Sequence, residues 1–139
     1  MEELETMKVL PDFTEVVAQL DDADDESPFE QVPIRERLGK LDEEDRASLA
    51  TYLDESSALW VTASIDDPLD PAKKRVVPIG YSTDGTWAWP SYWGYFVREY
   101  GVEVPDEFIA HARERNFAPA VLDRDALRAA EREFENLLG

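Results

Sequence analysis

The sequence predicts an α+β fold, in which a small antiparallel sheet of about three strands packs with about five helices. Three observations lead to this prediction. Two β-type runs flank Asp84-Gly85, and a two-residue Asp-Gly loop is a strong signal for a β-hairpin. Apolar residues recur at helical spacing before this hairpin and again after it. Helices that gather on either side of a short antiparallel sheet are typical of α+β domains.

The central hairpin combines large aromatic residues with very small ones. With a turn centred on Asp84-Gly85, Ser82 pairs with Trp87 and Gly80 pairs with Trp89. Side chains alternate across a strand, so the two indoles share one face with these small residues. Neither face of the hairpin is polar. We therefore expect the hairpin to be covered on both sides or to present an aromatic surface to a partner.

The helices are predicted from apolar stripes and from the residues that cap them. Asp12, Asp42, Ser91 and Asp123 are positioned to cap helices through their side-chain oxygens. Gly101 supplies the left-handed residue that ends a helix. The expected helices span residues 12–20, 42–55, 91–100, 106–116 and 123–138, an additional strand spans 59–65, and residues 28–40 form a connector.

Composition indicates a single domain, residues 1–139, that folds around an apolar core. The chain has 139 residues and is 43% hydrophobic, which suffices for a core without covalent staples. It has no cysteine, which excludes disulfides, thiolate zinc sites and cysteine nucleophiles. The acidic amino terminus lacks the pattern of a signal peptide, and no apolar run reaches membrane-spanning length. We therefore expect a cytoplasmic protein that does not act on membranes.

The strongest compositional feature is negative charge. The chain carries 32 acidic and 14 basic residues, for a net charge of −18. This charge opposes binding to nucleic acid and to anionic membranes, and it favours steered association with a basic protein. A contribution to solubility alone is the other interpretation. The basic cluster at residues 73–75 is flanked by acids, and we expect it to serve internal charge balance.

The densest acidic run lies at residues 21–27, and we expect a flexible loop there. The run contains no large apolar residue, and like charges packed this closely repel one another. Carboxylates in a loop are typical calcium ligands, but this run lacks the glycine and the terminal glutamate of a twelve-residue calcium loop. A calcium site is therefore not predicted.

The sequence offers little equipment for catalysis. His111 is the one histidine, so a multi-histidine metal site is excluded, and we expect it to be a partly exposed helix residue. The six glycines are scattered singly and form no phosphate-binding loop. We predict no catalytic residue, no metal and no cofactor. The alternative, a small carboxylate-dependent enzyme, requires paired acids in an apolar pocket, one of them with a raised pKa.

Aromatic and acidic residues are the candidates for binding a partner. Tyr92 and Tyr95 fall off the apolar stripe of their helix, so they are the better candidates for exposure. Exposed rings anchor interfaces, and an acidic rim around them suits a partner rich in arginine or lysine. The predicted partner-binding residues are the acidic Asp21, Asp22, Asp24, Asp25, Glu26, Asp42, Glu43, Glu44 and Asp45 and the aromatic Trp87, Trp89, Tyr92 and Tyr95.

One segment carries a resemblance to known proteins. Residues Gly80–Pro90 contain the run DGTWAWP and are followed by Tyr100-Gly101, Pro105, Phe108 and His111. Over roughly residues 75–117 the chain resembles small acidic bacterial proteins with a DGTWxWP segment, some of which resemble immunity proteins of polymorphic toxin systems. The resemblance implies no site residues beyond the segment itself.

Composition and resemblance lead to the same functional prediction. We expect a non-catalytic, immunity- or antitoxin-like inhibitor that neutralises a basic toxin or a nucleic-acid-acting enzyme. The alternative is a DNA mimic or adaptor module, which requires acids in two rows at phosphate-like intervals on one surface. The oligomeric state is left open by the sequence.

Overall fold

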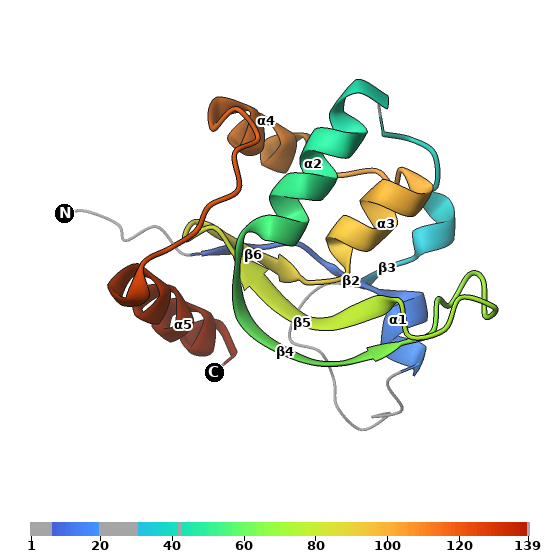
Figure 1. Cartoon of the computed structure of the whole chain (residues 1–139), viewed down its shortest axis with the longest axis horizontal. Helices are drawn as coiled ribbons and strands as arrows, with labels where there is room; N and C mark the ends of the chain where they lie inside the picture. Colours follow the sequence, from blue (N-terminus) through green and yellow to red (C-terminus); the bar gives the residue numbers. More distant parts are fainter. Residues whose placement is uncertain (1–6, 20–30, 42, 139) are drawn as a thin grey trace.

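The computed structural model describes residues 7–19, 31–41 and 43–138 (Figure 1). Its elements in chain order are β1 (Lys8–Val9), β2 (Asp12–Phe13), α1 (Thr14–Gln19), β3 (Gln31–Val32), the short 3-10 helix η1 (Ile34–Glu36), α2 (Glu43–Glu55), β4 (Ser57–Ile65), β5 (Val77–Thr83), β6 (Trp87–Pro90), α3 (Trp93–Tyr100), α4 (Asp106–Glu114) and α5 (Arg124–Leu138). The predicted α+β class is confirmed. None of the described helices is long and apolar enough to cross a membrane.

The main sheet has four strands in the order β1-β6-β5-β4, and β2 pairs with β3 in a separate two-stranded sheet. β4, β5 and β6 are antiparallel, whereas β1 runs parallel to β6. The strand count exceeds the predicted three because β1, β2 and β3 have only two residues each, too few for a period-two pattern to show in the sequence.

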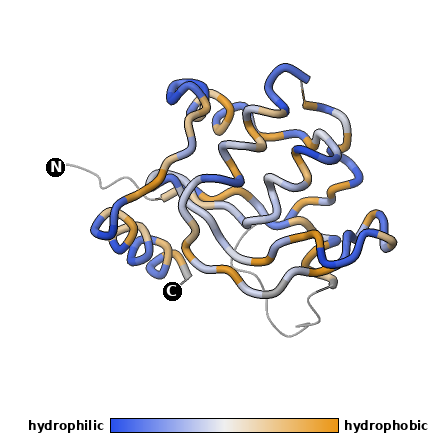
Figure 2. The backbone as a smooth tube through the Cα atoms, viewed as in Figure 1, coloured by the Kyte–Doolittle hydropathy of each residue, from blue (hydrophilic) through white to orange (hydrophobic). Residues whose placement is uncertain are grey.

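Helices cover both faces of the main sheet, with α2 and α3 on one side and α5 on the other (Figure 1). The larger core lies on the side of α2 and α3 and includes Tyr52, Trp89, Trp93, Phe96 and Phe108. The smaller core lies under α5 and includes Met7, Ala88, Ala130 and Phe134. Hydrophilic residues along α5 are interleaved with hydrophobic ones, as a helix that packs on one side requires (Figure 2). The expectation that the hairpin is covered on both sides is confirmed.

The turn between β5 and β6 lies one residue later than the sequence predicts. Ser82 pairs with Trp89 rather than with Trp87. The backbone N–H of Asp84 donates to the carbonyl of Trp87 over 3.2 Å, which leaves Gly85-Thr86 as the loop. The side chain of Asp84 causes the shift, because its Oδ1 accepts hydrogen bonds from the two N–H groups that follow the loop glycine. The pairing moves by two positions, so both indoles remain on the predicted face.

Two predicted helix ends are confirmed by their capping geometry. Gly101 follows α3 with φ +58°, and its N–H donates to the carbonyl of Val97. Asp123 precedes α5, and its Oδ1 accepts a hydrogen bond of 2.8 Å from the N–H of Ala126. Both ends therefore form by local chemistry that the sequence displays directly.

Two other predicted caps are wrong. Ser91 forms no capping hydrogen bond, because its hydroxyl lies 3.0 Å from the hydroxyl of Ser82 on the neighbouring strand. Asp12 is not a helix cap but belongs to β2, and α1 begins only at Thr14. The predicted cap Asp42 and the predicted flexible loop at 21–27 lie outside the described residues.

Candidate functional site

A cavity of about 860 Å³, partly open to solvent, lies where β1, the β5–β6 turn, β6, α4 and α5 meet. Three glutamates line it: Glu107 and Glu114 from α4 and Glu133 from α5. The remaining titratable side chains of its lining are those of Lys8 and His111. Glu107, His111 and Glu114 are spaced by four and three residues, which places them on one face of α4. The cavity lining therefore has a net negative charge, with three carboxylates against one ammonium.

Asp84 stands behind the turn residues of this cavity, and its side chain has no exposed surface. Its Oδ1 accepts hydrogen bonds from the N–H groups of Thr86 and Trp87 at 2.9 and 2.8 Å. Its Oδ2 accepts from the Tyr52 hydroxyl and from Nε2 of His111, the latter at 2.7 Å. Burial alone raises the pKa of Asp84, but these donors outweigh it and hold the pKa below its ordinary value near 3.8. Asp84 is therefore a buried carboxylate at neutral pH.

The buried carboxylate orients His111 and selects its tautomer. An ionised carboxylate only accepts hydrogen bonds, so Nε2 of His111 must carry the proton that it shares with Asp84. In the neutral ring Nδ1 is then an acceptor, and it forms no hydrogen bond to any other described residue. The imidazole packs near the rings of Trp87 and Phe108, with centroids 6.4 and 6.3 Å away. Its side chain is 19% exposed and lines the cavity.

One corner of the cavity already holds a cation supplied by the chain itself. Lys8 is the β1 residue paired with Trp87, and its Nζ lies 5.7 Å from the centroid of the indole ring. The same ammonium forms an ion pair with Glu107. Trp87 is held in place by an edge-to-face contact with Phe108, at a centroid distance of 5.2 Å. An aromatic face beside a carboxylate is a general arrangement for binding cations.

Taken together, the cavity offers acceptors and negative charge, which suit binding of a cation better than proton transfer. A carboxylate that acts as a general acid needs a raised pKa, whereas the pKa of Asp84 is lowered. Within residues 7–19, 31–41 and 43–138, no group of three or more histidine, cysteine, aspartate or glutamate side chains is arranged to hold a metal ion.

The predicted acidic residues have different surroundings in the structure. Glu43 and Glu44 are exposed at the start of α2. Asp45 is half-buried and forms an ion pair of 2.9 Å with Arg113. These three do not line the acidic cavity. The other predicted acids, Asp21, Asp22, Asp24, Asp25, Glu26 and Asp42, lie outside the described residues.

The prediction that Tyr92 and Tyr95 are exposed is wrong, since they are 3% and 6% exposed. Trp87 and Trp89, the other aromatic residues predicted to bind a partner, are buried as well. Trp89 donates from Nε1 to the carbonyl of Leu53. The two tyrosines fall off the apolar stripe because their hydroxyls donate to buried aspartates: Tyr92 to Asp12 at 3.0 Å and Tyr95 to Asp67 at 2.6 Å. Helical spacing cannot show such tertiary partners. Among these four, only Trp87 lines the cavity.

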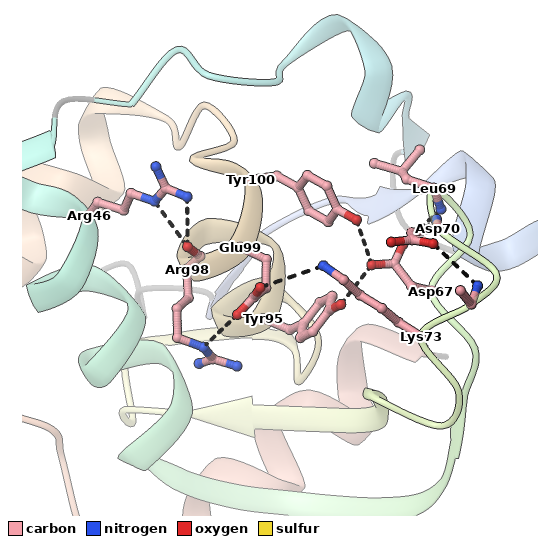
Figure 3. A network of polar contacts seen from close by, with 10 residues as sticks. Arg46, Asp67, Leu69, Asp70, Lys73, Tyr95, Arg98, Glu99 and Tyr100 are labelled. Atoms are coloured by element: carbon pink, nitrogen blue, oxygen red, sulfur yellow. Dashed lines mark hydrogen bonds and ion pairs between the residues drawn. The ribbon is translucent and has the colours of Figure 1, made fainter.

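Asp67 organises a second polar network, which holds the loop between β4 and β5 against α3 (Figure 3). Its Oδ2 accepts hydrogen bonds from the hydroxyls of Tyr95 and Tyr100 at 2.6 and 2.7 Å. Burial alone raises the pKa of Asp67, but the hydrogen bonds from these hydroxyls and from two backbone N–H groups of the loop outweigh burial and hold the pKa below its ordinary value. Lys73 extends the network to Glu99, with an Nζ–Oε1 distance of 3.8 Å. The network therefore holds the loop in place, and its polar groups are hydrogen-bonded or ion-paired with one another.

Internal charge balance is confirmed for the lysines of the 73–75 cluster. Lys73 pairs with Glu99, and Lys74 pairs with Asp66 at 3.3 Å. One exposed ring was not singled out by sequence reasoning: Trp60 on β4 is 45% exposed. No signal in the sequence separates this indole from the buried ones, because β4 is an edge strand only by virtue of the topology.

The residues of the acidic cavity were also missed as a set. The sequence singled out Asp84 for its turn and His111 as a helix residue, but it did not bring them together. The polar stripe of Glu107, His111 and Glu114 on α4 is the one signal that was available.

Comparison with known proteins adds no information on this cavity: no family model matches the chain, and no curated protein or solved structure is significantly similar to it.

Proposed function

We propose that the chain is a non-catalytic acidic inhibitor, of the immunity or antitoxin type, that binds a basic toxin or nucleic-acid-acting enzyme. The observation that carries the proposal is the acidic cavity rimmed by Glu107, Glu114 and Glu133, in which an indole and a carboxylate already hold the ammonium of Lys8. A basic partner finds both charge and an aromatic surface there.

The distribution of basic residues supports the same proposal. Of the 14 lysines and arginines, eight form ion pairs with acidic side chains of the chain itself: Lys8, Arg35, Arg37, Arg46, Lys73, Lys74, Arg98 and Arg113. More than half of the basic side chains are thus engaged within the molecule, whose net charge of −18 gives it a negative electrostatic field. Such a field accelerates encounters with a basic protein, and salt weakens the effect.

The side chains proposed to bind the partner differ from those of the sequence-based hypothesis. Trp87, Trp89, Tyr92 and Tyr95 are part of the core, so they do not serve as exposed anchors. The carboxylates around the cavity take that role, and the Trp87 ring is part of the cavity wall. The exposed Glu43 and Glu44 at the start of α2 contribute to the field rather than to the cavity.

The test compares two triple variants that change the net charge equally. One replaces the cavity glutamates, as Glu107→Gln, Glu114→Gln and Glu133→Gln. The control replaces three exposed glutamates elsewhere, as Glu36→Gln, Glu55→Gln and Glu135→Gln. Each protein is co-expressed with a basic toxin domain whose expression stops growth, and growth rescue and association rate are measured.

We expect the unmodified chain and the control to restore growth and the cavity variant to fail. The association rate should fall by about tenfold in the cavity variant and should decline steeply with added salt for the unmodified chain. Equal behaviour of the two triple variants would remove the cavity from the proposal. An association rate that does not respond to salt would remove its electrostatic basis.

A further inference from the structure

We propose that the acidic cavity receives an arginine side chain of the partner, whose guanidinium takes the place of the Lys8 ammonium and donates to Nδ1 of His111. This inference rests on the proposed function and names the group that the cavity recognises. Three observations support it: the orientation of His111, the polar atoms around the cavity and the position of Lys8.

The first argument is the fixed orientation of His111. Asp84 is fully buried and receives donors on both oxygens, so it remains an acceptor toward Nε2 of His111. In its neutral form the histidine therefore uses its one N–H on Asp84 and keeps Nδ1 as an acceptor. A ligand that donates hydrogen bonds suits this ring, whereas a ligand that only accepts does not. The buried carboxylate thus acts as a positioning residue for the imidazole.

The second argument is that nearly all of the polar side chains of the cavity accept hydrogen bonds. Glu107, Glu114 and Glu133 are carboxylates, and the one cationic side chain of the described lining, Lys8, is already paired with Glu107. A guanidinium has five N–H donors in a planar fork and no acceptor, and it stacks on aromatic faces. An ammonium is a compact point charge with three donors. Separated carboxylates, a ring nitrogen and an indole therefore match arginine better than lysine.

The third argument is the position of Lys8, which marks where a cation binds. Its Nζ lies over the Trp87 ring and bonds to Glu107, although its side chain is 55% exposed and free to leave. A cavity of about 860 Å³ has ample room for a guanidinium beside these groups. Lys8 is therefore a weak internal competitor, and removing it should strengthen binding of an external cation.

The experiment uses three short peptides of the form acetyl-Gly-Ser-X-Ser-Gly-amide, in which X is arginine, lysine or citrulline. Citrulline has the shape of arginine without its charge. His111 is the only histidine in the chain, so its imidazole signals in an NMR spectrum report on this cavity alone. Long-range nitrogen–proton correlations identify the tautomer, recorded at mildly alkaline pH before the peptides are added.

We expect a proton on Nε2 in the free protein and saturable shifts of the His111 signals with the arginine peptide. The lysine peptide should bind about fivefold more weakly, and the citrulline peptide at least about tenfold more weakly. Lys8→Met should tighten binding of the arginine peptide by about threefold. A proton on Nδ1, or equal binding of the arginine and citrulline peptides, would overturn the inference.

Matched variants separate the cavity from the general charge. His111→Phe keeps a ring against Trp87 and Phe108 but removes the acceptor, and it should weaken the arginine peptide by about tenfold, measured by calorimetry. Glu133→Gln should also weaken it, whereas Glu135→Gln, two residues along the same helix and exposed, should not. Tryptophan fluorescence checks that each variant is folded. Partner binding that is sensitive to salt but unaffected by His111→Phe would refute this inference and leave the proposed function standing.

Discussion

Replacing Asp84 by asparagine tests the arrangement on which the cavity depends. The carboxylate accepts four hydrogen bonds while fully buried. A hydrogen bond to a charged acceptor contributes about 1 kcal/mol more than one between neutral groups, so the four bonds lose about 4 kcal/mol in total. The amide recovers part of this because it is cheaper to bury than a charge. We expect the free energy of unfolding to fall by about 2–3 kcal/mol, or about 10 °C in Tm.

The fold should survive this substitution for a specific reason. The asparagine oxygen can keep the two backbone N–H groups of the turn, and its amide N–H groups then face Tyr52 and His111. The tyrosine hydroxyl can rotate to accept, and His111 can accept at Nε2 only by moving its proton to Nδ1. The variant should therefore reverse the tautomer of His111 and lose the acceptor that faces a ligand.

The pH dependence of the stability of Asp84→Asn tests whether Asp84 is a buried carboxylate. The native pKa of Asp84 lies below its ordinary value near 3.8. A lowered native pKa stabilises the fold above the unfolded value, and this contribution is lost as the pH falls through the native value. The free energy of unfolding, measured in urea, should thus differ most between the unmodified chain and Asp84→Asn near neutral pH. The difference should become smaller below about pH 4.

An exposed aspartate provides the control. Asp106→Asn makes the same chemical change at the surface and should leave the unfolding midpoint almost unchanged. Equal stability of Asp84→Asn and the unmodified chain at neutral pH, or a difference that does not vary with pH, would refute the assignment of Asp84 as a buried carboxylate.

Two further predictions concern the β4–β5 pair and its loop. Gly80→Ala should destabilise the chain by about 3 kcal/mol or more in chemical denaturation, because a Cβ there would lie 2.2 Å from the carbonyl oxygen of Trp60, a backbone atom that cannot move aside. A loss below about 1 kcal/mol would contradict this packing. Tyr95→Phe removes one donor to Asp67 and should cost about 1–2 kcal/mol. It should also speed tryptic cleavage at residues 73–75, and an unchanged rate of cleavage would contradict the role of Asp67 in holding the loop.

Local chemistry determined much of the fold, and the sequence displays it. Gly101 ends a helix because a left-handed residue must lie there, and Asp123 caps the next N–H groups within its own turn. The apolar stripes of α2, α3 and α5 likewise identify the faces that pack on the sheet. Interactions that span a few residues are encoded within those residues, so the α+β class was predictable.

Tertiary structure decided where the polar side chains find partners. Asp84 lies 32 residues from Tyr52 and 27 from His111, and Asp67 lies 28 residues from Tyr95, so no spacing rule connects them. Each buried carboxylate draws tyrosine hydroxyls inward, and this is why Tyr92 and Tyr95 are core residues despite their off-stripe positions. The Asp84 side chain, whose Oδ1 sets the hairpin register through the turn N–H groups, is also held from the tertiary structure, by Tyr52 and His111 on Oδ2.

The acidic charge was evident from composition, but the convergence of three glutamates on one cavity was not. The cavity glutamates come from α4, whose Phe108 packs in the larger core, and from α5, whose Phe134 packs in the smaller core, so only the tertiary fold brings them to one cavity. Composition sums charges along the chain, whereas a binding site depends on which of them the fold brings close together. Charge sign is thus a property of the sequence, and charge convergence is a property of the tertiary structure.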